Sequence, residues 1–146
     1  MPIDDMLSEW EKCSPQFEEM LIAAPDEIAG QAIFDAFTHE QDLRHALGVP
    51  GARDSDAMEI GWAWIGGART RASLPALLFV TEDGEMVVGS GAPRATVGAS
   101  RFELLRACTG RRSASEIASY RWEPGPEPEL LLAGPIFSLR TEPLNE

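Results

Sequence analysis

The sequence has few basic residues, few cysteines and no long apolar run. Twelve lysines and arginines stand against 24 acidic residues, which gives a net charge of −12. This balance argues against nucleic acid or an anionic membrane as a partner, because both require a basic surface. No apolar run approaches the roughly 20 residues that span a bilayer. The chain does not open with a basic segment followed by an apolar one, so we expect no signal peptide and a cytoplasmic protein.

Several signatures of catalysis are also missing. Cys13 and Cys108 form no CxxC pair, and each falls in an apolar helical pattern typical of a buried thiol. The sequence shows no Ser/His/Asp constellation and no phosphate-binding glycine loop. The cluster Gly89-Ser90-Gly91 follows a predicted strand but precedes no helix, which a dinucleotide site would require.

The N-terminal segment is acidic and amphipathic. Lys12 is the one basic residue before Leu43, which is typical of a solvated helix surface, with an acidic docking face as the alternative. Pro15 predicts a kink or break near Ser14, or a second helix that Ser14 caps. Apolar or small side chains recur at steps of three and four, which predicts a helix over residues 3–24: Ile3, Met6, Trp10, Cys13, Phe17, Met20 and Ala24.

A second helix is predicted from about residue 25 to Leu47, where Gly48 would end it. Its expected core face carries Ile33, Ala36, Phe37, Leu43 and Leu47. A neighbouring stripe has apolar ends and a polar middle, and such a face usually borders a pocket or a buried polar network.

Asp35 and His39 form the centre of that polar stripe. A carboxylate and an imidazole four residues apart share one helix face, so they can hold one metal ion or join one polar network. A histidine that is simply hydrogen-bonded to Asp35 is the alternative. Asp42, one turn on, would orient His39 or belong to the solvated face. His45 lies off the stripe and is expected at the surface.

The remaining pattern changes from helices to strands near residue 74. A third helix is expected over about 55–70, and its glycines (Gly61, Gly66, Gly67) would allow close packing of another element. Trp62 and Trp64 point to different faces of it, so at least one should reach an interface or cleft. Strands are predicted over 76–81, 85–90 and 94–99, capping boxes at Ser100 and Ser113, and a short helix and a strand, or a tail, over 130–139. The fold class is therefore α+β, with a helical region over 1–73 and an α+β lobe over 74–146.

Two motifs resemble the mycothiol-dependent maleylpyruvate isomerase family. The first is Asp35-Ala-Phe-Thr-His39-Glu-Gln-Asp42-Leu-Arg-His-Ala-Leu-Gly48, continued by Val-Pro-Gly-Ala-Arg-Asp-Ser-Asp56. The second is Phe102-Glu-Leu-Leu-Arg-Ala-Cys-Thr-Gly-Arg-Arg112-Ser-Ala-Ser-Glu-Ile117, followed by Trp122 and an acid-proline connector. The resemblance implies part of a DinB-like four-helix bundle that carries a divalent metal, followed by a lobe similar to sterol carrier protein.

The same resemblance implies a ligand set for the metal. In the family, one histidine comes from an early helix, and an acidic residue and a histidine separated by three residues come from a later helix. Asp35 and His39 match the later pair, whereas no histidine precedes His39. We therefore expect an N-terminally truncated relative, with zinc as the metal and mycothiol as the cofactor that the resemblance supplies.

Two classes of function follow as expectations. A metal-dependent isomerase or thiol transferase would need a third ligand from a homodimer or from a partner chain, and half a bundle would also need such a partner. The alternative is a small-molecule-binding or accessory protein whose N-terminal helices mediate dimerisation or complete a partner's bundle. In either class Trp64 would line a cleft, and Arg111 and Arg112 would bind a carboxylated ligand, unless they only complement the dipole at a helix C-terminus.

Overall fold

The computed structural model describes residues 1–146 and has the predicted α+β class, with five α-helices and a four-stranded mixed sheet. None of its helices combines the length and the apolar character that a membrane-spanning segment requires. The elements are, in order, α1 (Ile3–Ala23), α2 (Asp26–Leu47), α3 (Asp56–Arg71), β1 (Pro75–Thr81), β2 (Gly84–Val88), β3 (Ser90–Gly98), α4 (Arg101–Cys108), α5 (Ala114–Ala118), β4 (Arg121–Glu123) and the 3-10 turn η1 (Pro128–Leu131).

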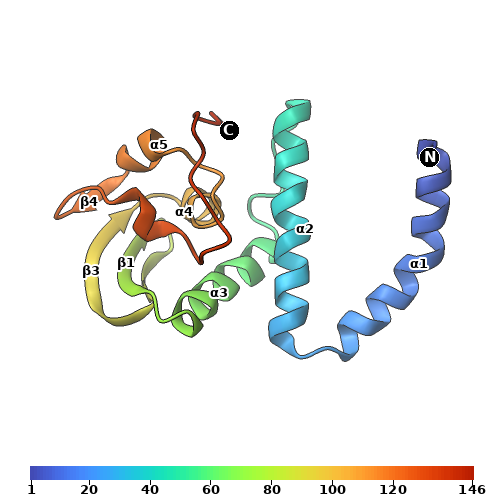
Figure 1. The fold of residues 1–146 in the computed structure, drawn as a ribbon, viewed down its shortest axis with the longest axis horizontal. Coiled ribbons are helices and arrows are strands. Elements are labelled where there is room, and N and C mark those ends of the chain that lie inside the picture. The colour runs from blue at the N-terminus through green and yellow to red at the C-terminus, as the bar shows by residue number, and fades with distance from the viewer.

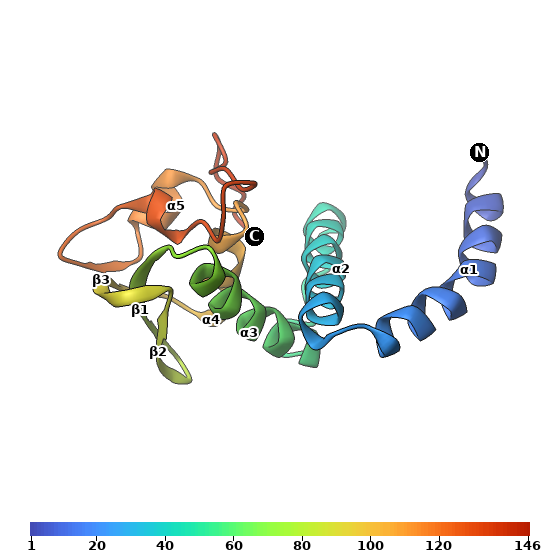
Figure 2. The same ribbon diagram turned by 60° about the horizontal axis from the view of Figure 1, so that its bottom comes forward.

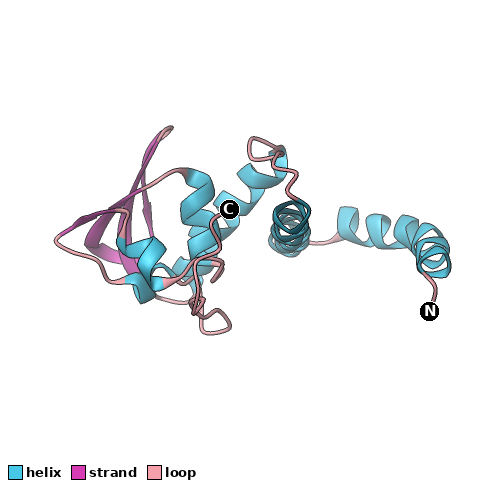
Figure 3. Cartoon of the chain, turned by 90° about the horizontal axis from the view of Figure 1, so that it is seen from above, coloured by secondary structure: helices cyan, strands magenta, loops and turns pink.

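Helix α1 projects away from the rest of the molecule (Figures 1 and 3). It runs unbroken through Pro15 and bends in its middle (Figure 2), so the predicted kink agrees with the structure and a second helix starting at Ser14 does not. None of its residues is buried. Cys13 is therefore exposed, contrary to its predicted burial, because α1 packs against no other part of the chain along that face.

Helix α2 ends at Gly48, whose left-handed φ of 65° closes the helix as predicted. Its buried face differs from the expected apolar stripe. Phe37 is buried, but Leu43 and Leu47 are 64% and 74% exposed. Only one side of α2 meets the lobe, and that side carries Phe34, Phe37, Thr38 and Gln41.

Helix α3 crosses α2 closely at one glycine. A Cβ atom at Gly61 would lie 2.4 Å from the ring of Phe34 and 3.2 Å from Leu105. The two tryptophans of α3 face different partners, as predicted: the Trp64 ring lies 5.1 Å from that of Phe34, and the Trp62 ring lies 5.7 Å from that of Phe79 in β1.

The sheet has the order β2-β1-β3-β4, with β1 and β3 parallel and the other two pairs antiparallel. The predicted strands over 76–81, 85–90 and 94–99 all form. Ser113 and Glu116 make the full capping box, whereas at Ser100 only the serine half forms, because the Glu103 carboxylate pairs with Arg112. No strand forms within 130–139, and this segment instead continues from η1 as a tail.

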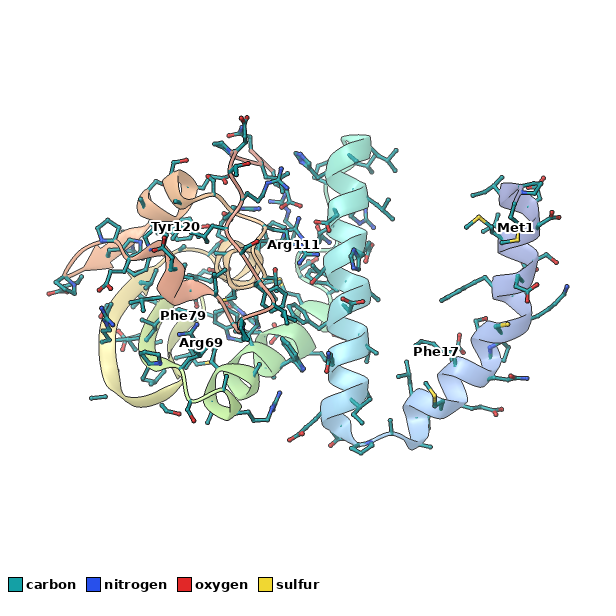
Figure 4. All side chains as sticks on the ribbon, in the orientation of Figure 1. Met1, Phe17, Arg69, Phe79, Arg111 and Tyr120 are labelled. Atoms are coloured by element: carbon teal, nitrogen blue, oxygen red, sulfur yellow. The ribbon has the colours of Figure 1, made fainter.

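One hydrophobic core joins these elements. Buried residues from α2, α3, β1, β2, β3, α4, α5 and η1 make up a single cluster, so residues on both sides of position 74 contribute to it. Arg69 lies at 0% exposure inside the molecule (Figure 4) and donates to the carbonyl oxygens of Leu131, Leu132 and Pro75. Burial lowers the pKa of Arg69, and its three hydrogen bonds fasten the C-terminal tail to α3 and β1.

Candidate functional site

Asp35 and His39 are exposed on α2, and Asp42, one turn on, is partly buried. His39 Nε2 lies 3.6 Å from Asp35 Oδ1, and His39 Nδ1 lies 3.7 Å from Asp42 Oδ2. The two carboxylates thus flank opposite nitrogens of one ring, and no point is close to all three groups. Nowhere does the structure gather three or more His, Cys, Asp or Glu side chains that could hold a metal ion. The donors of this chain alone do not fit a resident metal, which takes at least three protein ligands.

Asp42 is held more closely by arginines than by His39. Arg106 Nη2 donates to Asp42 Oδ1 at 2.6 Å, and Arg111 Nη2 donates to Oδ2 at 3.4 Å. Partial burial raises the pKa of Asp42, but the hydrogen bonds and charges of the two arginines outweigh burial and hold this pKa below 3.8. Asp42 is therefore ionised at neutral pH and ties α2 to α4.

A polar cleft of about 450 Å³ lies beside Asp42. It is bounded by the C-terminal half of α2, the loop after α4 and the tail that follows η1. Its walls carry both charged and apolar side chains, namely Asp42, His45, Thr109, Gly110, Arg111, Ile136, Phe137, Ser138, Arg140 and Leu144.

A smaller hollow of about 90 Å³ continues the cleft along α2. It is lined by Asp35 and Trp64, and it shares Arg111 and Phe137 with the larger cleft. Figure 4 shows Arg111 between α2 and the end of α4. The tertiary structure therefore brings four predicted site residues around two adjoining hollows: Asp35, Asp42, Trp64 and Arg111.

The two adjacent arginines have different surroundings. The Arg112 side chain is 2% exposed and donates twice to Glu103, each time at 2.7 Å, and once to Glu146 at 2.9 Å. Burial lowers the pKa of Arg112, but its two carboxylate partners raise this pKa by more than burial lowers it, so the net shift is upward. Arg112 is thus fully engaged inside the protein. Arg111 is 22% exposed, and it donates to the Thr109 carbonyl at 2.9 Å and only distantly to Asp42.

Three functional candidates were not expected from the sequence. His45, predicted at the surface, is half-buried in the cleft wall, and Arg140 lines the same cleft. Arg106 lies at 0% exposure and joins Asp42 to Glu146. Local signals point to two of these residues: His45 follows Asp42 at the i+3 spacing, and Arg106 interrupts an apolar helical run. No local signal points to Arg140.

Neither Thr109 nor the neighbouring Cys108 is available as a nucleophile. The Thr109 hydroxyl donates to backbone carbonyls of α4, and burial raises the pKa of the adjacent Cys108 thiol to about 12. Comparison with protein-family models, curated proteins and solved structures finds no match for this chain. The family resemblance therefore rests on the sequence motifs alone, and the assignment of a function rests on the cleft.

Proposed function

We propose that the protein binds a small carboxylate-bearing molecule in the cleft along α2. The observation that carries this proposal is the position of Arg111, which lines both parts of the cleft. A guanidinium is planar and presents donors in a fork that matches a carboxylate. An arginine whose one acidic contact is the long one to Asp42, at 3.4 Å, keeps donors for such a ligand.

In the larger cleft the local charges favour an anion, even though the whole chain is acidic. Asp42 accepts its short hydrogen bond from Arg106, so its negative charge is already compensated within the protein. Arg111 is left with its longer contact to Asp42, and Arg140 adds a positive charge at the rim. The cleft volume of about 450 Å³ suits a small ligand.

The family resemblance supports the same ligand class. It names a maleylpyruvate-like acid as substrate, which carries the carboxylates that Arg111 would bind. The resemblance also implies a specific architecture within the α+β class, a partial DinB-like bundle with a lobe similar to sterol carrier protein. In this proposal, binding is the activity of the single chain, and catalysis is not required.

Titration with maleate tests the proposal. We expect saturable binding by isothermal titration calorimetry, weakened at least about tenfold by Arg111→Ala, which removes a charge-assisted hydrogen bond. Arg94→Ala, an exposed arginine of β3, is the matched control and should leave binding unchanged. Equal affinity in Arg111→Ala and wild type, or equal binding of the uncharged maleic diamide, would refute the proposal.

A metal-dependent isomerase or thiol transferase is the second candidate, and the Asp35/His39 pair favours it. These two side chains, 73% and 62% exposed, remain free to ligate, but the third ligand would have to come from another chain. Elemental analysis of the purified protein decides this candidate. Near-stoichiometric zinc that is lost in His39→Ala and kept in His45→Gln supports it, and metal-free protein excludes it for this chain.

A further inference from the structure

One face of α1 is apolar and uncovered, and Phe17 on this face lies on the side toward α2 (Figure 4). Five of its large apolar side chains are between 43% and 68% exposed, namely Ile3, Met6, Trp10, Phe17 and Met20. Leu7 and Leu21 widen the face on one side. The pattern repeats every seven residues, and its first and fourth positions are Ile3, Met6, Trp10, Cys13, Phe17 and Met20.

A helix whose apolar face is uncovered is not expected to stay folded alone. Isolated helices are marginal in water, and most helical stability in proteins comes from packing of the apolar face. Pro15 weakens α1 further, because it removes one backbone donor from the helix interior. The 21 residues of α1 therefore need a partner that covers this face.

The charges on α1 indicate which partner fits. The positions that flank an apolar seam carry a single charged side chain, Glu9, beside Leu7, Ser14, Gln16, Leu21 and Ala23. The other charges lie on the far side of the helix, at Asp4, Asp5, Glu11, Lys12, Glu18 and Glu19. A basic partner helix would meet few acids beside the seam. A second copy of α1 would meet few like charges there, so a copy of this chain is the occupant that the charge pattern favours.

We propose that α1 pairs with α1 of a second copy and forms a twofold dimer. The exposed apolar side chains leave roughly 700 Å² per copy to be covered, close to the roughly 800 Å² per partner of a standard interface. A twofold arrangement uses the same face on both copies, so this one helix completes the interface. The proposal is independent of the ligand cleft, which lies on the other side of α2.

Light scattering coupled to size exclusion, from about 1 to 100 µM, tests the dimer. We expect twice the chain mass of 15.9 kDa at the upper concentration. Phe17→Asp places a charge in the seam on both copies at once and should weaken association at least about 100-fold. The matched control is Ser8→Asp, which introduces the same charge on the far face of α1 and should leave the dimer unchanged.

Circular dichroism and maleate binding separate assembly from folding. Because α1 buries no side chain within its own chain, Phe17→Asp should keep the thermal unfolding of the lobe and its maleate affinity. Its helical signal should fall by about a quarter as the unpaired α1 unfolds. Wild type that remains monomeric at about 100 µM overturns the proposal, as does equal association of the Phe17→Asp and Ser8→Asp variants.

Discussion

Replacing Gly61 by alanine should destabilise the protein, although alanine is the better helix former. Gly61 lies where α3 crosses α2, and its missing side chain lets the ring of Phe34 approach. The added Cβ would lie 2.4 Å from Phe34 Cδ2 and 3.2 Å from a methyl group of Leu105. Ordinary carbon contacts are about 3.5–4.0 Å, so the ring would have to move by about 1 Å.

The net effect follows from two opposing terms. Overpacking a core costs about 1–3 kcal/mol, and the upper end applies because Phe34 is 4% exposed and already packs against Trp64. Glycine to alanine in a helix interior contributes about 0.8–1 kcal/mol in the opposite direction. The free energy of unfolding should therefore fall by about 1–2 kcal/mol, and Tm should fall by about 3–6 °C for a chain of this length.

Gly66→Ala is the matched control, because its Cβ would meet only Val88, at 3.9 Å. Here the propensity gain is unopposed, so Tm should rise by about 2–4 °C. Thermal unfolding followed by circular dichroism measures both variants. A Gly61→Ala protein as stable as Gly66→Ala would refute the packing of α2 on α3 described above.

Three further predictions concern buried charges and thiols. Arg106→Leu should lower the free energy of unfolding in urea by about 1.5–3 kcal/mol, because it leaves Asp42 with only its long contact to Arg111 and Glu146 with only Arg112. A loss below about 1 kcal/mol would contradict this. Arginines outweigh burial and lower the pKa values of Asp42 and Glu103 in the folded state. The wild type should therefore lose stability as pH falls below the ordinary pKa values of these groups, 3.8 for Asp42 and 4.5 for Glu103. A free energy of unfolding that is unchanged between pH 5 and 3 would count against this. Ellman's reagent at pH 8 should label Cys13 alone in the Phe17→Asp variant, whose α1 is unpaired, because Cys108 is buried with a pKa of about 12. Labelling of Cys108 without unfolding would show the core to be open.

Local features of the fold could be predicted because they depend on neighbouring residues. Gly48 ends α2 through its left-handed backbone, and Ser113 caps α5 through atoms three residues away. The strands predicted over 76–81 and 85–90 form as β1 and β2 and pair across the short turn between them. Each of these signals acts over one turn of chain, where sequence spacing and spatial distance are equivalent.

The candidate site could be predicted only in part, because most of its contacts join residues that are far apart in the sequence. The spacing of Asp35 and His39 placed them on one helix face, as observed. Sequence spacing could not show that Asp42 would meet Arg106, which lies 64 residues away, or that Arg112 would be buried against Glu103. A carboxylate and a guanidinium attract at any separation in sequence, so only the folded chain decides which pairs form.

The sequence by itself determined that this is an α+β chain with an acidic, amphipathic first helix and with a carboxylate and a histidine on one face of the second. The tertiary structure decided which faces are covered. It buries Phe34 and leaves Leu43 exposed, and it places Arg111 in a cleft while it encloses Arg112. It also leaves the apolar face of α1, with Cys13 in its middle, without a partner in the same chain. Amphipathic spacing creates an apolar face, but the packing of distant segments decides whether that face is buried.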